Sequence, residues 1–308
     1  MMIPIVFDQR ATGVVRGSRL EKLCSGAAWG EGPIWIAEDE ALLWSDIPNN
    51  RMLRWNEQEG MTVWATDVEF TNGHYRDLDG SLLHCSHGSR AVMRTPLVNG
   101  RLLASTPMER VVDRYQGKRL NSPNDVVVKR DGTIWFTDPP YGILSDAEGH
   151  KAPAEQRANH VFRFDPQTQE LKAMTDWLDE PNGLAFSPDE RLLYVSDTSA
   201  ALRPAGQGKH HIVVFDVIGD QLANPRGFAE IAPGLPDGFR IDTHGWLYTS
   251  SLDAVQIYHP DGTFLAKLPI PEKVGNLTFG GPLGDQLYVV ASTSLYRIKL
   301  NTRGTQPT

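Results

Sequence analysis

The 308-residue sequence has few cysteines and no long apolar run. Its two cysteines, Cys24 and Cys85, have no partner at ligand spacing, which argues against a disulfide-rich scaffold, a cysteine-based zinc site and a redox motif. No stretch approaches the roughly 20 apolar residues of a membrane helix. The first twenty residues contain several charged side chains and no apolar core, so we expect no signal peptide and a soluble, cytoplasmic protein without membrane contact.

The sequence also lacks an excess of basic residues. Its formal net charge is −8, and a nucleic-acid partner requires a basic surface, so we expect none. Glycine and proline, by contrast, are abundant, with 28 and 21 residues spread along the chain. Breakers at this density favour many short strands joined by turns over long helices.

One sequence pattern recurs six times along the chain. Each copy has a polar residue, a short apolar strand, a turn and a second strand, and a third strand usually follows. The copies span residues 31–46, 72–87, 124–138, 182–197, 237–251 and 276–292. Recurrence at about 40–50 residues is typical of propeller blades, and the longer gaps contain loop-like Gly/Pro/Ala-rich segments. A β-sandwich would not repeat in register.

We therefore predict an all-β fold, a six-bladed β-propeller in which residues 1–308 form a single domain. A closed ring protects the edges of its sheets. The N-terminal segment is expected to supply the outer strand of the last blade, either around Val14 and Val15 or at residues 20–23.

The leading polar residues of the six copies should meet at one mouth of the channel, because the first strand of every propeller blade lines the channel in the same direction. They are Glu31, Asn72, Asn124, Asn182, Asp237 and Asn276. Asn and Asp are common in turns, which is sufficient to explain each of them singly. It does not explain Glu31, or why every copy carries a side-chain oxygen at this place.

A ring of side-chain oxygens suits a hard divalent cation. Calcium takes six to eight oxygen ligands, and magnesium also prefers oxygen. The two carboxylates, Glu31 and Asp237, would give the site a charge of −2. Soft-metal sites need cysteine or paired histidine, and the ring contains neither.

Several motifs resemble the gluconolactonase family, which includes senescence marker protein (regucalcin) and luciferin-regenerating enzyme. They are GEGPIW, SPNDVVV, FTDPPYG, EPNGLAFSPD and LPDGF, and NSPNDVVVKRDGTIWFTDPPYG resembles the bacterial sugar-lactonase branch. The resemblance covers about residues 20–300. It implies a six-bladed propeller with one catalytic divalent metal ion, bound by Glu31, Asn182 and Asp237. It also implies that Asp237 is the general base and that Asn124 contacts the substrate.

The implied activity is that of a divalent-metal-dependent lactonase, a carboxylic ester hydrolase that opens a sugar lactone to its aldonic acid. D-Glucono-1,5-lactone is the first substrate to test. Ca²⁺ is the first candidate ion, with Mg²⁺, Mn²⁺, Zn²⁺ and Fe²⁺ as alternatives. The sequence predicts no oligomeric state.

The substrate contacts differ from those of the animal members of the family. These carry an arginine two residues before the substrate-contacting asparagine, and Ser122 occupies that position here. We consider Arg203 and Arg240 as replacements. His87 and Tyr141 are expected to contact the sugar hydroxyls.

Other polar residues fall near the strand ends. His74 and Asp138 could also reach the mouth, whereas Asp46 and Asp197 end second strands and are expected to support turns or blade packing.

Two alternative functions stay open. One is a phosphotriester hydrolase that uses the same metal site, and the other is a non-catalytic calcium-binding propeller. A serine-hydrolase mechanism has no support, because the sequence contains no Gly-x-Ser-x-Gly motif.

Overall fold

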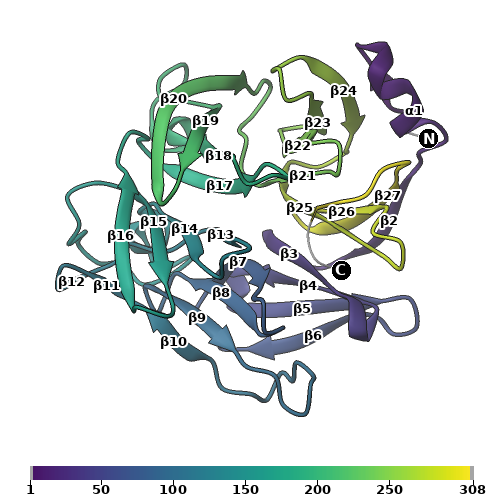
Figure 1. Cartoon of the computed structure of the whole chain (residues 1–308). Helices are drawn as coiled ribbons and strands as arrows, with labels where there is room; N and C mark the ends of the chain where they lie inside the picture. Colours follow the sequence, from purple (N-terminus) through teal and green to yellow (C-terminus); the bar gives the residue numbers. More distant parts are fainter. Residues whose placement is uncertain (1–2, 306–308) are drawn as a thin grey trace.

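The computed structural model describes residues 3–305, in which six antiparallel sheets of four or five strands are arranged around a central channel (Figure 1). The chain passes through the sheets in sequence order. This confirms the predicted six-bladed β-propeller. Within the described residues, no helix is long and apolar enough to cross a membrane.

The first three blades take up the N-terminal half of the chain. Their strands, from the channel outward, are β3 (Gly30–Ile36), β4 (Ala41–Asp46), β5 (Arg51–Asn56) and β6 (Gly60–Thr66) in blade one; β7 (Thr71–Arg76), β8 (Leu82–Ser86), β9 (Ala91–Thr95) and β10 (Glu109–Val112) in blade two; and β13 (Val126–Val128), β14 (Ile134–Asp138), β15 (His160–Asp165) and β16 (Glu170–Thr175) in blade three.

The last three blades follow the same order. Their strands are β17 (Pro181–Phe186), β18 (Leu192–Asp197), β19 (His211–Ile218) and β20 (Gln221–Glu230) in blade four; β21 (Phe239–Ile241), β22 (Leu247–Ser250), β23 (Ala254–Tyr258), β24 (Phe264–Pro269) and β1 (Ile5–Val6) in blade five; and β25 (Val274–Gly280), β26 (Gln286–Ala291), β27 (Ser294–Lys299) and β2 (Leu20–Ser25) in blade six. The remaining elements are the hairpin β11 (Arg114–Tyr115) and β12 (Lys118–Arg119), the helices α1 (Thr12–Val15) and α2 (Tyr141–Leu144), and four 3₁₀ turns at Gln9–Ala11, Ala37–Asp39, Ile47–Asn49 and Ser199–Leu202.

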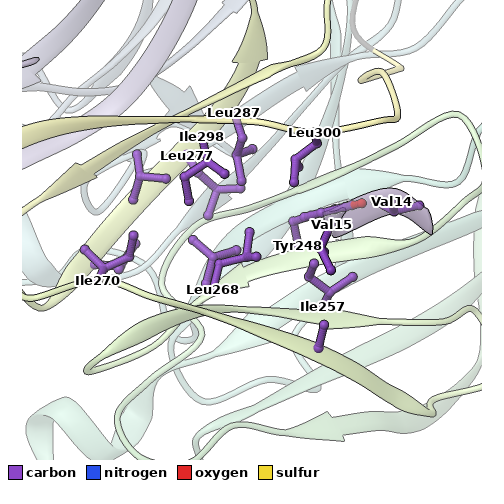
Figure 2. Close-up of a cluster of buried hydrophobic side chains, with 14 of the residues drawn as sticks. Val14, Val15, Tyr248, Ile257, Leu268, Ile270, Leu277, Leu287, Ile298 and Leu300 are labelled. Atoms are coloured by element: carbon purple, nitrogen blue, oxygen red, sulfur yellow. The ribbon is translucent and has the colours of Figure 1, made fainter. Parts of the chain in front are cut away.

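Two N-terminal segments lie against the last blades in different ways. Strand β2 pairs antiparallel with β27 at the outer edge of blade six. Val14 and Val15, the other stretch considered for this strand, instead belong to helix α1. They pack into a buried cluster between blades five and six that includes Leu268, Leu277 and Ile298 (Figure 2).

The apolar core is divided among the interfaces between neighbouring blades. Side chains alternate across a strand, so successive residues of one strand face opposite neighbours. In β3, Trp35 packs against Tyr288 of blade six, whereas Ile34 and Ile36 belong to the cluster shared with Leu82 of blade two. Each blade is therefore held from both sides, and the channel-facing positions are left for polar residues.

The leading polar residues differ in one detail from the prediction that each lies just before its first strand. Glu31, Asn72, Asn182 and Asn276 lie within the first strands of their blades, at or beside breaks in the pairing register. Such β-bulges bend a strand and redirect a side chain, a role they often have next to active sites. Asn124 and Asp237 do precede β13 and β21.

Candidate functional site

The six leading residues gather at one mouth of the channel. Five of them line a cavity of about 340 Å³, namely Glu31, Asn72, Asn124, Asn182 and Asp237. The sixth, Asn276, is buried beside this cavity, and its Nδ2 donates a hydrogen bond to Glu31 Oε2 at 3.2 Å. A repeated local pattern thus produces one polar site shared by all six blades.

Glu31 is a buried carboxylate with an unsatisfied oxygen. Its Oε2 accepts hydrogen bonds from Asn276 and, at 3.3 Å, from the backbone N–H of Gly32. Its Oε1 is buried and has no hydrogen-bond partner among the described residues. Burial, and after it the negative charge of Asp237, raises the pKa of Glu31 well above its usual range. A buried charge without a partner is costly, so Glu31 needs either a cation or a proton.

Asp237 is the second carboxyl group at the mouth. Burial raises its pKa to about 6, although the Lys273 ammonium and a hydrogen bond with the Asn182 side chain oppose this shift. The negative charge of Glu148 raises the pKa further. Two carboxyl groups that share a desolvated site favour either a retained proton or a bound cation.

Contacts between neighbouring blades fix the backbone that carries Asp237. Its carbonyl oxygen accepts a hydrogen bond from the Gly183 N–H at 3.0 Å and another from Ser196 Oγ at 3.2 Å. Its own N–H donates to Ser250 Oγ at 2.7 Å. A Cβ atom on Gly183 would lie 2.4 Å from the Asp237 carbonyl oxygen, so glycine is required for this close approach. The backbone from which the carboxyl group projects is therefore held by hydrogen bonds on both sides.

Asn72 and His87 form one wall of the cavity. Asn72 Nδ2 lies 3.2 Å from His87 Nε2, and His87 Nδ1 lies 2.8 Å from the carbonyl oxygen of Glu148. The amide group donates and the carbonyl accepts, which assigns the proton of a neutral ring to Nδ1. Burial lowers the pKa of His87 to about 4, in agreement with a neutral ring. His87 thus connects the ring to the loop that carries Glu148.

Tyr141 and Asn182 are joined through a hydroxyl group. Thr198 Oγ1 lies 2.7 Å from the Tyr141 hydroxyl and accepts a hydrogen bond from Asn182 Nδ2 at 3.2 Å. Because the amide nitrogen of Asn182 is used in this way, its carbonyl oxygen is the atom available to a cation. Asn124 also lines the cavity, and its side chain has no hydrogen-bond partner within the described part of the chain.

Ser122 does not line the cavity. Its hydroxyl donates to the carbonyl oxygen of Pro139 at 2.6 Å and accepts from the N–H of Gly142 at 2.9 Å. These bonds hold both ends of the short segment that carries Tyr141. The residue at the family's arginine position therefore positions the cavity wall and makes no contact with the cavity itself.

Three aspartates at the ends of second strands support loops. Asp46 Oδ1 accepts from the N–H of Ala28 at 2.8 Å, and Asp138 Oδ2 accepts from the N–H of Asn121 at 2.8 Å. Asp197 accepts from backbone N–H groups of residues 179, 180 and 199. Asp46 and Asp197 have the packing role that the sequence predicted, and Asp138 shares it instead of reaching the mouth.

The two arginines proposed to replace the family's arginine lie elsewhere. Arg203 pairs with Glu180 at 3.1 Å outside the cavity lining. Arg240 is buried deeper in the channel, with Nη1 at 3.5 Å from Asp125 Oδ2. That prediction was wrong, because each guanidinium is held near a carboxylate that the sequence did not place beside it. His74 likewise does not line the cavity. Its Nε2 lies 2.9 Å from Ser45 Oγ among buried residues.

The cavity also contains residues that the sequence analysis missed. Trp29, Glu148, Thr198 and Lys273 all line it. Trp29 and Thr198 have a local signal, since each directly adjoins a motif that was recognised. Glu148 and Lys273 have none, because they come from loops whose course depends on the assembled blades.

The residues present fit a hard divalent cation. The site offers two carboxylates and an amide oxygen, all of them oxygen donors, and the buried Oε1 of Glu31 is without a partner. No group of three or more His, Cys, Asp or Glu side chains in residues 3–305 is arranged to hold a metal ion. A cation in this cavity would therefore need amide oxygens beside the two carboxylates, and Asn182, whose amide nitrogen donates to Thr198, leaves its carbonyl oxygen for that purpose.

In the metal-free protein, the contribution of Asp237 to stability should be lost as the pH rises from about 4 to about 6. The folded-state pKa of Asp237, about 6, lies above the ordinary value of 3.8, so within this window the folded state binds more protons than the unfolded state. The stabilisation is full below the lower pKa and is lost above the higher one. Urea unfolding of chelated wild type and Asp237→Asn should give curves that diverge in favour of the variant as the pH rises. Parallel curves would contradict the assignment.

The chain matches the SMP-30/Gluconolactonase/LRE-like region over residues 29–293. It belongs to this family. It is 32% identical to a gluconolactonase of Zymomonas mobilis over 92% of this chain and 82% of that protein. It is also similar to the structure of a gluconolactonase from Xanthomonas campestris, at 38% identity and a TM-score of 0.87, covering 97% of this chain and 94% of that one. A luciferin-regenerating enzyme shares the fold, with a TM-score of 0.73 at 19% identity over 94% and 97% of the two chains.

In this member of the SMP-30/gluconolactonase family, the matched region contains all six leading residues, from Glu31 to Asn276. Strand β2, which completes the outer edge of blade six, precedes the matched region. The family match thus covers the part of the chain that builds the mouth of the channel.

Proposed function

We propose that the protein is a divalent-metal-dependent hydrolase of sugar lactones, with D-glucono-1,5-lactone as the first substrate to test. The observation that carries the proposal is the pair of desolvated carboxyl groups, Glu31 and Asp237, facing one cavity of about 340 Å³. The gluconolactonases at 32% and 38% identity support the lactone as substrate. A cavity of this volume accommodates a single sugar ring.

In this proposal, Glu31, Asn182 and Asp237 hold the cation, with Ca²⁺ as the first candidate. A divalent cation bound there would polarise the lactone carbonyl and lower the pKa of a bound water. Its positive charge would also offset the burial that raises the pKa values of both carboxyl groups, and the negative charge of Asp237 that adds to the shift of Glu31. The bound cation would thereby keep the carboxyl groups of Glu31 and Asp237 ionised at neutral pH.

Asp237 acts as the general base. It accepts a proton from the attacking water as the new C–O bond forms at the lactone carbonyl carbon. Asn124 donates its amide N–H to the oxyanion that develops on the carbonyl oxygen. When the tetrahedral intermediate collapses, the ring C–O bond breaks and the protonated Asp237 returns its proton to the leaving alkoxide. The product is the open-chain aldonic acid.

Metal removal and reconstitution test this function. The protein is stripped with a chelator and reloaded singly with Ca²⁺, Mg²⁺, Mn²⁺, Zn²⁺ or Fe²⁺, and acid release is followed on a panel of sugar lactones and a phosphotriester. We expect lactone hydrolysis that disappears on chelation and returns with at least one ion. Metal-dependent turnover of the phosphotriester alone would favour the alternative hydrolase, and no turnover with any ion would favour a binding protein.

A further inference from the structure

The cavity at the channel mouth has one cationic side chain among the described residues that line it, that of Lys273. We propose that Lys273, together with Glu148 and Trp29, binds the hydroxyl groups of a neutral sugar lactone and thereby determines substrate specificity. This inference rests on the proposed lactonase function. It assigns the polar recognition to a loop residue directly before β25 of blade six, whereas Ser122 precedes β13 of blade three.

Lys273 is a free donor held in place by an aromatic ring. Its Nζ lies 4.7 Å from the centroid of the Trp29 ring, within the range of a cation–π contact. No carboxylate lies within ion-pair distance of it in residues 3–305, whereas Lys172 and Lys267 form ion pairs with aspartates at 2.9 and 2.7 Å. An ammonium group carries three N–H donors, so those of Lys273 remain available to a ligand.

Glu148 places an acceptor in the same cavity. Its backbone carbonyl is held by His87 Nδ1 at 2.8 Å. The next residue packs so closely that a Cβ atom on Gly149 would lie 2.0 Å from the carbonyl oxygen of Gly142. The loop is therefore fixed against the cavity wall. Glu148 and Lys273 line the same cavity, where burial raises the pKa of Glu148 and the positive charge of Lys273 opposes this shift.

The charges of the cavity favour a neutral ligand. Three carboxylates (Glu31, Asp237 and Glu148) and one ammonium line it, and His87 is neutral, so a bound dication brings the lining to neutrality. An anionic substituent placed beside Lys273 would also meet Glu148. A hydroxyl group can instead accept from the ammonium and donate to the carboxylate, while the Trp29 ring offers an apolar surface to the C–H groups of a sugar.

The test compares two lactones with the same six-membered ester ring. D-Glucono-1,5-lactone carries hydroxyl groups, and δ-valerolactone carries none. In the metal-loaded protein, we expect Lys273→Met to lower kcat/KM for the hydroxylated lactone by about 10- to 100-fold, mainly through KM, which is the effect of losing a hydrogen bond from a charged donor. For δ-valerolactone, kcat/KM should change by less than about twofold, since the reacting atoms are untouched.

Control variants separate the role of the ammonium from general damage. Lys273→Arg retains charge and donors and should recover most of the activity, whereas Lys172→Met, on the outer strand β16, should behave as the wild type. Glu148→Gln should also reduce kcat/KM for the hydroxylated lactone selectively. Wild type should hydrolyse a 6-phosphorylated gluconolactone less efficiently than the unphosphorylated one.

The outcomes distinguish the two proposals. Equal losses on both lactones in Lys273→Met, or no loss on either, would overturn the role of Lys273 in hydroxyl recognition while leaving the lactonase intact. If the wild type prefers the phosphorylated lactone, the inference that the substrate is neutral is wrong. If the metal-loaded wild type hydrolyses neither lactone, the proposed function itself fails.

Discussion

Asp237→Asn is expected to lower kcat/KM for D-glucono-1,5-lactone by about 10²–10⁴-fold, the contribution of a positioned general base. An amide cannot accept the proton of the attacking water. The substitution keeps the size of the side chain, and the backbone contacts to Gly183, Ser196 and Ser250 involve only main-chain atoms of residue 237. The loss should therefore appear without a change of fold. Steady-state assays of acid release measure it.

The same variant should make the metal-free protein more stable at neutral pH. Because burial raises the pKa of Asp237 to about 6, its ionised form is a liability when no cation is bound, and asparagine removes that charge. If Asp237→Asn has a higher Tm without metal but loses activity, the carboxyl group of Asp237 serves function and lowers the stability of the metal-free protein. The matched control is Asp253→Asn in the same blade, where the carboxylate is half-exposed and paired with Lys267.

The activity of Asp237→Asn also has an outcome that contradicts the proposal. Turnover above about a tenth of the wild-type rate would exclude Asp237 as the general base.

Glu31→Gln is expected to abolish the stabilisation of the protein by its metal ion. In the wild type, a cation at 100 times its Kd adds about 2.7 kcal/mol, which corresponds to a rise in Tm of about 4 °C for a chain of this length. Without the Glu31 carboxylate, the site loses one of two negative charges and the oxygen that has no other partner. The rise in Tm should then fall below about 1 °C at the same concentration.

Calorimetric titration of Ca²⁺ into the chelated protein provides a second readout that does not depend on catalysis. Glu38→Gln is the matched control. Glu38 also belongs to blade one, but it does not line the cavity, and its Oε1 lies 2.8 Å from Arg76 Nη1 in an ion pair. It should retain the full metal-induced rise in Tm. An unchanged rise in Glu31→Gln would remove Glu31 from the ligand set.

The repeat pattern was sufficient to predict the blades. A short apolar strand flanked by glycine or a turn, recurring six times in register, has one way to bury its apolar face, which is against the neighbouring copies. The alternation of Ile34, Trp35 and Ile36 between two neighbouring blades follows the same rule. The strand bulges that carry Glu31 and Asn182 were not predicted, because the extra residue is accommodated only when the second strand is paired beside it.

The candidate site was predicted in part for the same reason. Glu31, Asn182 and Asp237 occupy equivalent positions in their blades, so a local pattern places them at one end of the channel. Arg203 and Arg240 were misplaced, since charge and sequence position do not reveal that Glu180 and Asp125 lie beside them. Ser122 was considered only as a missing contact, whereas it anchors the segment that carries Tyr141.

The sequence by itself determined the all-β architecture, the six blades and the leading polar residue of each, because all three depend on a short local pattern of about 20 residues and on its recurrence along the chain. Only the tertiary structure decided which groups share a hydrogen bond or a charge. Asn276 donates to Glu31 across 245 residues, and Lys273 lies over the ring of Trp29 and lines the same cavity as Glu148 of blade three. Such contacts exist only once the ring has closed, since closure sets the distances between loops that the chain keeps far apart.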